Sequence, residues 1–219
     1  MALRCGGWMP SPLPVPPRCW HPADPRRTAG RWYPAGMARR SFEEPELEAL
    51  RLAALEHVRQ YGDPVLRTPA ERIEVFDEAL VAEVHEMARI MEDGRGVGLA
   101  APQLGRLRRL ITVAPFDDGA VHAFVNPEII EHSDETGVAT EGCLSIGEIN
   151  VEVERYDWIR VRAQDLNGTQ FEAVIEDFPA RVVQHEIDHL DGILILDRAS
   201  PEDRRAALAE LRDSLLPSA

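Results

Sequence analysis

The chain has 219 residues, of which 44% are hydrophobic and 28% are charged, as is typical of a globular protein with a substantial core. Its formal net charge of −14 argues against a general nucleic-acid binder, which needs a basic surface to neutralise phosphates. No apolar run reaches the roughly 18 residues of a membrane-spanning helix, and the sequence contains no lysine, which excludes Schiff-base chemistry.

Residues 1–40 differ in composition from the rest of the chain. The stretch PSPLPVPPRCWHPADP is dense in proline, and the segment holds seven arginines but only one acid, Asp24. Such a composition does not supply a periodic apolar face, so we expect an irregular leader. An organellar transit peptide would fit the arginine content but not the low serine content. We favour a third interpretation, in which the true start is Met37 and the upstream residues come from an over-long reading of the gene.

Residues 41–219 are expected to form one catalytic domain that begins with two helices. The first, over residues 41–62, starts with a capping box of Ser41 and Glu44 and stops at Gly62. The second, over residues 76–94, carries one apolar stripe, made of Leu80, Val84, Met87 and Met91. A glycine-rich turn, GRGVGLAAPQLG, follows over residues 94–105.

Short β-type runs occupy the middle of this domain. They cover residues 109–115, 122–130, 149–165 and 169–177, with a hairpin turn, LNG, between the last two. Residues 178–192 are predicted to form a helix that ends at Gly192, and residues 200–216 an amphipathic helix capped by Ser200. We therefore predict an α+β fold, in which antiparallel or mixed β-sheets wrap around the central helix over residues 178–192.

The central helix contains QHEIDHLDG, in which His185 and His189 lie one turn apart and Glu186 follows the first of them. Residues four apart on a helix share a face, so both imidazoles can bind one metal ion while the glutamate leans over its open side. A catalytic metal needs a third protein ligand. Cys143, in TEGCLSIG, is the candidate, although a lone cysteine is more often a small buried hydrophobe.

Three stretches occur in a fixed order, namely GVGLAAPQ (residues 96–103), EGCLS (141–145) and QHEIDHLDG (184–192). Together with YGDPVLRTPA (61–70) and VNP (125–127), they resemble the motifs of the peptide deformylase family. These hydrolases remove the formyl group from the initiating N-formylmethionine of nascent chains. The resemblance covers most of the folded chain, and it favours Cys143 as a metal ligand over Cys143 as a buried hydrophobe.

The resemblance implies a role for each matched residue. The metal ligands would be Cys143, His185 and His189, with a fourth place left for water. The metal lowers the pKa of that water, and the resulting hydroxide attacks the formyl carbon with Glu186 as general base and then acid. The backbone N–H of Leu144 and the side-chain amide of Gln103 would stabilise the oxyanion.

Substrate contacts are also implied. Gly98 lies where a side chain would crowd the substrate. Val97, with residues of the metal-binding helix, would line an apolar pocket for the methionine side chain. Arg155 stands in the sequence close to the position of another arginine that is familiar in the family, so it is a further candidate for substrate binding. After EGCLSI, however, Gly147 and Asn150 stand where many members have a proline and an arginine that helps to hold the peptide backbone. The resemblance therefore does not extend to substrate affinity or to peptide preference, since a lost charge-assisted hydrogen bond typically costs about 1.5–3 kcal/mol.

We expect one Fe(II) ion per chain, with Zn(II) as the alternative, because a thiolate ligand leaves the metal less positive. The expected partners are N-formylmethionyl peptides and, transiently, nascent chains at the ribosome, with no direct binding to nucleic acid or membrane. The expected location is the cytoplasm, or an organelle if residues 1–40 act as a transit peptide.

Two other functions fit part of the pattern. One is a zincin-type metalloendopeptidase, and the other is a catalytically silent module that binds formylated peptides or the ribosome, against which the intact Glu186 argues. His85 begins a similar motif, HEMAR, but Arg89 replaces the second histidine, so we expect no ligand there. Asp191 could fix the tautomer of a ligand histidine.

Overall fold

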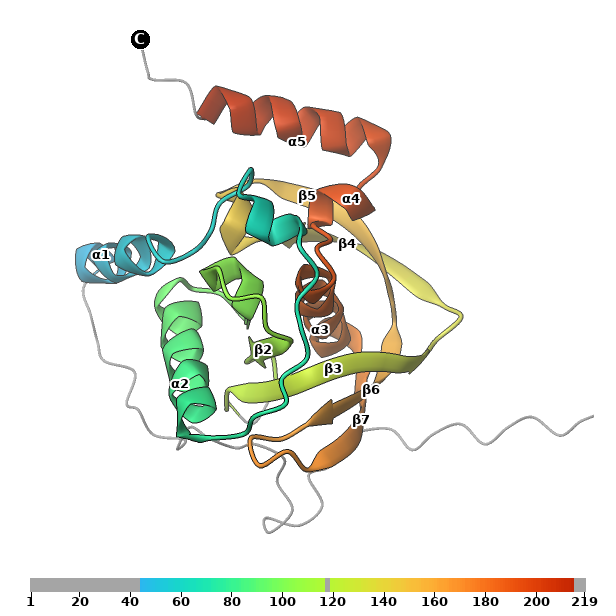
Figure 1. The fold of residues 1–219 in the computed structure, drawn as a ribbon. Coiled ribbons are helices and arrows are strands. Elements are labelled where there is room, and N and C mark those ends of the chain that lie inside the picture. The colour runs from blue at the N-terminus through green and yellow to red at the C-terminus, as the bar shows by residue number, and fades with distance from the viewer. Residues whose placement is uncertain (1–43, 117–118, 215–219) are drawn as a thin grey trace, which may run out of the picture.

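The computed structural model describes residues 44–116 and 119–214 (Figure 1). The expected leader over residues 1–40 and the Ser41 cap lie outside these residues. A central helix, with sheets on more than one side of it, confirms the predicted α+β class. Among the described residues, no helix is both long enough and apolar enough to cross a membrane.

The four predicted helices are present in the predicted order, the first is shorter than predicted, and a short helix over residues 195–198 was not predicted. The helices are α1 (Glu44–Leu55), α2 (Glu78–Asp93), α3 (Asp177–Leu190), α4 (Ile195–Arg198) and α5 (Pro201–Ser214), with 3-10 turns η1 (Pro64–Arg67), η2 (Ala101–Leu104) and η3 (Leu144–Ile146). The predicted stripe of α2 is buried. The first helix ends at Leu55 rather than Gly62, because the backbone N–H groups of Arg59 and Tyr61 donate to the distant carbonyls of Gln103 and Ser145, both at 2.7 Å.

Two antiparallel sheets contain the strands. The larger has the order β1-β2-β3-β6-β7 and the smaller pairs β4 with β5. The strands are β1 (Gly98–Ala100), β2 (Leu110–Val113), β3 (His122–His132), β4 (Thr136–Gly142), β5 (Asn150–Tyr156), β6 (Trp158–Gln164) and β7 (Gln170–Glu176). Strand β4 was not predicted, because its side chains are mostly exposed and give no apolar alternation. The single run predicted over 149–165 is two strands, since the chain passes at Asp157 from the small sheet to the large one.

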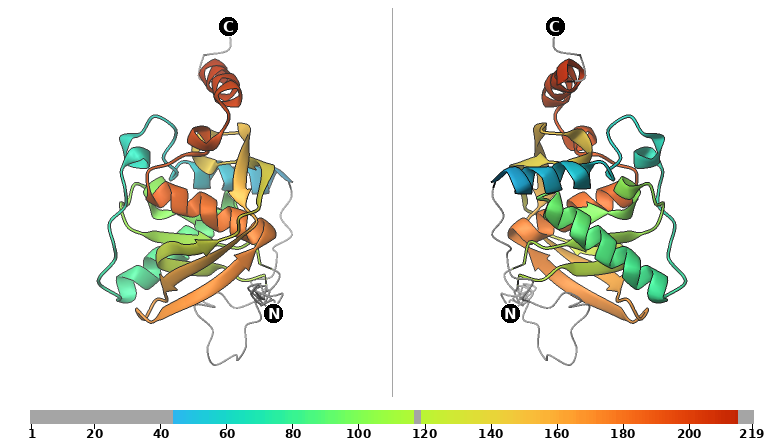
Figure 2. Two further views of the ribbon diagram at one scale, coloured as in Figure 1. Left: turned by 90° about the vertical axis from the view of Figure 1, so that its right-hand side faces the viewer. Right: turned by 90° about the vertical axis from the view of Figure 1, so that its left-hand side faces the viewer.

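Helix α3 is the buried centre of the fold and contacts strands of both sheets (Figure 2). Gly192 follows α3 with a φ of +73°, and a Cβ there would lie 2.7 Å from the carbonyl oxygen of Arg67. Both facts require glycine, as the predicted helix end implies. Helix α5 lies on the outside of the molecule against β5, and the Ser200 hydroxyl accepts from the Asp203 N–H at 3.1 Å, which confirms the predicted cap.

Candidate active site

The thiol and the two imidazoles predicted to bind a metal lie together. His185 and His189 project from neighbouring turns of α3, and Cys143 stands between the end of β4 and the start of η3. Their ligand atoms all lie within 4.8 Å of one another, and Cys143 Sγ is 3.2 Å from His189 Nε2. All three side chains are buried. Two segments far apart in the sequence thus meet at one point.

Glu141 orients the first of these histidines. Its carboxylate lies 3.0 Å from His185 Nδ1, so it can accept that N–H and leave Nε2 available for a metal. Arg155 and Arg181 also donate to this carboxylate, at 3.1 and 2.8 Å. Burial opposes ionisation of Glu141, but hydrogen bonds from His185 and Arg155 lower its pKa to about 2. Glu141 is therefore a fixed anion behind the site.

The remaining acids of the histidine motif have other partners. Asp188 is 6% exposed and pairs with Arg155 and Arg198, so it orients neighbouring groups. Asp191 accepts from Arg109 at 2.6 Å. Asp191 was expected to fix the tautomer of a ligand histidine, but the carboxylate that contacts His185 is that of Glu141.

Glu186 lies beside the two histidines and is 3% exposed. Its Oε2 has no hydrogen-bond partner among the residues that the structure describes. Burial raises the pKa of Glu186 to about 7, although the nearby charge of His185 lowers it. A Cβ at Gly98 would lie 2.2 Å from Glu186 Oε1, so the absence of a side chain at Gly98 makes room for this carboxyl.

Gln103 is anchored at one end of its amide. Its Oε1 accepts from the Ala100 N–H at 2.8 Å, and this bond directs Nε2 toward Cys143 Sγ, 3.6 Å away, and Ser145 Oγ, 3.2 Å away. Leu144 follows Cys143 directly and begins η3. Both residues expected to stabilise an oxyanion therefore border the same centre.

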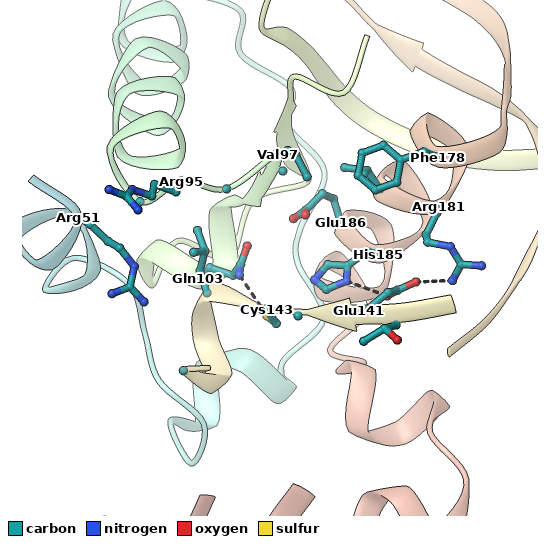
Figure 3. Close-up of a pocket in the computed structure, with 18 residues that line it drawn as sticks. Arg51, Arg95, Val97, Gln103, Glu141, Cys143, Phe178, Arg181, His185 and Glu186 are labelled. Atoms are coloured by element: carbon teal, nitrogen blue, oxygen red, sulfur yellow. Dashed lines mark hydrogen bonds and ion pairs between the residues drawn. The ribbon is translucent and has the colours of Figure 1, made fainter. Parts of the chain in front are cut away.

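These groups line a cavity of about 400 Å³ (Figure 3). Its walls include Val97, Gly98, Gln103, Cys143, Leu144, His185 and Glu186, all named in the sequence analysis. Arg155, expected to contact substrate, is not among the described residues that line the cavity. It is 5% exposed and lies behind the site, between Glu141 and Asp188.

The donor set fits a transition metal. A thiol and two imidazoles are the ligand types that Zn(II) and Fe(II) accept, and three protein ligands leave a position for water. His185 Nδ1 is already held by Glu141, and a buried carboxyl oxygen of Glu186 has no partner within residues 44–116 and 119–214, so a bound water would supply one. His85, by contrast, is exposed on α2 and does not belong to the cluster of three potential metal ligands found among the described residues.

Sequence reasoning missed four charged groups at this site, namely Arg51, Arg95, Glu141 and Arg181. Glu141 was detectable in part, because it lies two residues before Cys143 and alternate residues of a strand share a face. The three arginines come from α1, from the turn after α2 and from α3. Their placement depends on packing between elements.

Comparisons with known proteins agree with this geometry. A sequence profile described as polypeptide deformylase matches residues 55–205. Peptide deformylase from Thermotoga neapolitana is 48% identical over 156 residues, which are 71% of this chain and 94% of that protein. The crystal structure of peptide deformylase from Thermotoga maritima is 46% identical, with a TM-score of 0.64, and the match covers 66% of this chain and 97% of that one.

A plant structure gives the same result. Peptide deformylase 1B of Arabidopsis thaliana, solved with an inhibitor, is 36% identical with a TM-score of 0.69, and the match covers 72% of this chain and 89% of that one. The profile match, the identity of the relatives and the shared fold agree with a buried Cys-His-His cluster beside a glutamate. The chain therefore belongs to the polypeptide deformylase family of metal-dependent enzymes.

Proposed function

We propose that this enzyme hydrolyses the formyl amide of N-formylmethionyl peptides, releasing formate and a free amino terminus. One observation carries the proposal: a thiol and two imidazoles converge within 4.8 Å of one another beside a buried carboxyl, and Cys143, His185 and Glu186 of this group line a cavity. Val97 and Phe178 also line this cavity and are 42% and 56% exposed, so they offer apolar surface to a methionine side chain.

A metal held by Cys143, His185 and His189 would supply a Lewis acid that acidifies water and polarises the formyl carbonyl. We assign Fe(II), with Zn(II) as the alternative, because the thiolate reduces the positive charge of the centre. Metal analysis of protein purified without oxygen should find iron. Stoichiometric zinc, with turnover that iron does not increase, would contradict the Fe(II) assignment.

Glu186 would move the proton. Its carboxylate accepts a proton from the attacking water and passes it to the departing amine nitrogen. A pKa near 7 suits both steps, and a cation bound nearby would favour the ionised form that begins the reaction. Gln103 Nε2 and the Leu144 N–H would donate to the oxyanion, and the Ala100 bond holds the Gln103 amide in that direction.

The direct test is turnover. Protein loaded with Fe(II) without oxygen should convert formyl-Met-Ala-Ser to a peptide with a free amine. Glu186→Ala should keep the metal and the fold but lose turnover by about 10²-fold or more, the usual contribution of a general base. An inactive wild-type protein with its metal in place would reject the proposal, and full activity in Glu186→Ala would reject the proton role.

Cys143→Ala separates this function from the zincin-type endopeptidase. A peptidase whose third ligand lies elsewhere would keep its metal, whereas the deformylase should lose it. The second alternative, a silent binding module, predicts formyl-peptide binding without turnover. The buried Glu186 favours the enzyme, because a binding module gains nothing from a partnerless carboxyl oxygen.

We also propose that the substrates are nascent chains met transiently at the ribosome in the cytoplasm. The net charge of −14 disfavours stable docking on ribosomal RNA, and the buried Cys143 thiol suits a reducing compartment. An organelle remains the alternative location if residues 1–40 act as a transit peptide. Sedimentation with ribosomes at physiological salt should leave most of the protein in the supernatant.

A further inference from the structure

Two arginines stand at one end of the cavity, where the sequence predicted no site residue. Arg51 comes from α1 and Arg95 from the turn after α2, and both line the cavity that contains Cys143 and His185. Figure 3 shows them together at one end, with Phe178 and Arg181 at the opposite end. Cys143 and His185 lie between the two ends.

The segment that carries Arg51 is not part of the family match. The match begins at Leu55, the last residue of α1, so Arg51 precedes it. Helix α1 packs against α2, and Ala54 is 2% exposed in that contact. A helix beyond the matched region thus adds a cation to the wall of the cavity.

Arg95 is held in an unusual backbone conformation. Its φ is +60°, in the left-handed region that glycine adopts more easily, although glycines precede and follow it in the sequence. A non-glycine residue in this conformation that also lines a cavity is a reason to look for a function there. Its exposed partner, Glu44 at 3.6 Å, offers only a weak surface ion pair.

The partners of Arg51 are also exposed carboxylates. Arg51 is 23% exposed and pairs with Glu48 at 2.9 Å and Glu148 at 3.3 Å, whose side chains are 47% and 86% exposed. Pairs of this kind contribute little to stability, so an anion entering the cavity can replace them. Arg181 differs, because it is 14% exposed and donates to Glu141 and to the carbonyls of Val153 and Gly137. The cations open to exchange are therefore Arg51 and Arg95.

The strands that border the cavity suggest what approaches these arginines. Strand β1 is an edge strand of the larger sheet, and β4 belongs to the two-stranded sheet. Residues of both strands line the cavity. An extended peptide along such edges advances about 3.3 Å per residue. With its formyl group at the metal-binding cluster, the residues after methionine would extend toward one end of the cavity.

We propose that Arg51 and Arg95 form a carboxylate-binding subsite that selects formylated peptides with an acidic group one or two residues after methionine. This inference rests on the proposed deformylase function. The carboxylate comes from an aspartate or glutamate side chain, or from the carboxyl terminus of a short peptide. The pair acts as a specificity determinant and takes no part in the proton transfer assigned to Glu186.

The test compares amidated formyl-Met peptides carrying aspartate, asparagine or lysine at the first or second position after methionine. Amidation removes the terminal carboxylate, and a free-acid form of the asparagine peptide measures that source separately. Wild-type kcat/KM should favour aspartate over lysine by about fivefold to tenfold at one of the positions, mainly through KM. The double variant R51Q/R95Q should bring this ratio to within about twofold with kcat retained.

Two controls separate recognition from structure. R89Q removes an exposed arginine of α2 that pairs with Asp93, and it should leave the preference intact. E148Q removes the anion that competes for Arg51 and should strengthen the preference for aspartate. If R51Q and E148Q both lowered kcat/KM equally for all peptides, the proposal would be overturned. That result would mean that the ion pair between Arg51 and Glu148 only fixes α1 to the loop at Glu148.

The proposed function and the subsite fail in different ways. Wild-type turnover of formyl-Met-Ala-Ser with equal rates for the aspartate, asparagine and lysine peptides would reject the subsite and leave the deformylase intact. Absence of turnover with every peptide, in protein that retains its metal, would reject the deformylase itself. A preference for the free-acid peptide alone would assign the subsite to terminal carboxylates.

Discussion

At the scale of single residues, the site depends on contacts that restrict where the side chains of Glu186 and His185 can lie. Gly98 packs against Glu186, so that a Cβ there would lie 2.8 Å from Cδ and 2.9 Å from Cγ of the glutamate. Glu141 faces His185 Nδ1 from the other side of the site. Gly98 and Glu141 therefore position residues that are proposed to take part in the chemistry, and neither of the two needs to touch the substrate itself.

The substitution Gly98→Ala should displace the Glu186 carboxyl. Because misplacement by about 1 Å can cost on the order of 10²-fold in rate, we expect kcat to fall by that order. Metal content should not change, since the three atoms nearest to an added Cβ all belong to Glu186 and to none of the ligands. Gly137→Ala is the matched control, because a Cβ there meets the end of the Asp157 side chain at 3.1 Å. Normal kcat in Gly98→Ala would show that Glu186 has room to move.

The substitution Glu141→Gln should weaken metal binding. It replaces the anion that holds His185, and loss of such a partner typically costs about 10–100-fold in metal affinity. Competition with a chromogenic chelator measures this directly, and Glu131→Gln, which removes an exposed acid paired with Arg160, controls for the loss of charge. Unchanged affinity in Glu141→Gln would mean that the ring of His185 is held by packing alone.

At the scale of elements, one carboxylate links the short helix α4 to two other helical segments. Asp197 of α4 accepts from Arg67 of η1 and from the Leu194 N–H at 2.9 Å, and it lies 3.6 Å from Arg204 of α5. Burial opposes its ionisation, but the Arg67 and Leu194 hydrogen bonds lower the pKa of Asp197 below 3.8. One carboxylate therefore connects three helical segments.

This lowered pKa predicts a pH-dependent contribution to stability. Asp197 should stabilise the fold fully above its unfolded-state pKa of 3.8, and the contribution should vanish as the pH falls through the lower folded-state pKa. Asp197→Asn should therefore lower the free energy of unfolding by about 1 kcal/mol at neutral pH, given its partial exposure. Urea titrations of both proteins should converge in acid, and a constant difference down to about pH 3 would contradict the assignment.

At the scale of the whole molecule, local patterns predicted more than long-range ones. His185 and His189 lie on one helix, so their four-residue spacing in the sequence was enough to predict that they share a face. The α2 stripe and the Gly192 helix end were likewise local and are confirmed. Helix α1 was predicted too long, because the carbonyls that draw the chain away beyond Leu55 come from distant segments.

The charges around the site show the other limit. Arg155 was expected at the substrate, yet β5 carries it behind His185, where Glu141 of β4 and Asp188 of α3 receive it. Because β4 has few buried side chains, its pairing with β5 left no trace in the apolar pattern. Arg51 was not predicted for a similar reason, since only the packing of α1 against α2 brings it to the cavity.

The chain positions of the three ligands have a mechanical consequence. Cys143 and His189 lie 46 residues apart and belong to a strand end and a helix. An ion bound by both residues would link the small sheet to the buried helix α3. Removing the ion should loosen this link, so that proteases cut near Cys143 sooner and the melting temperature drops.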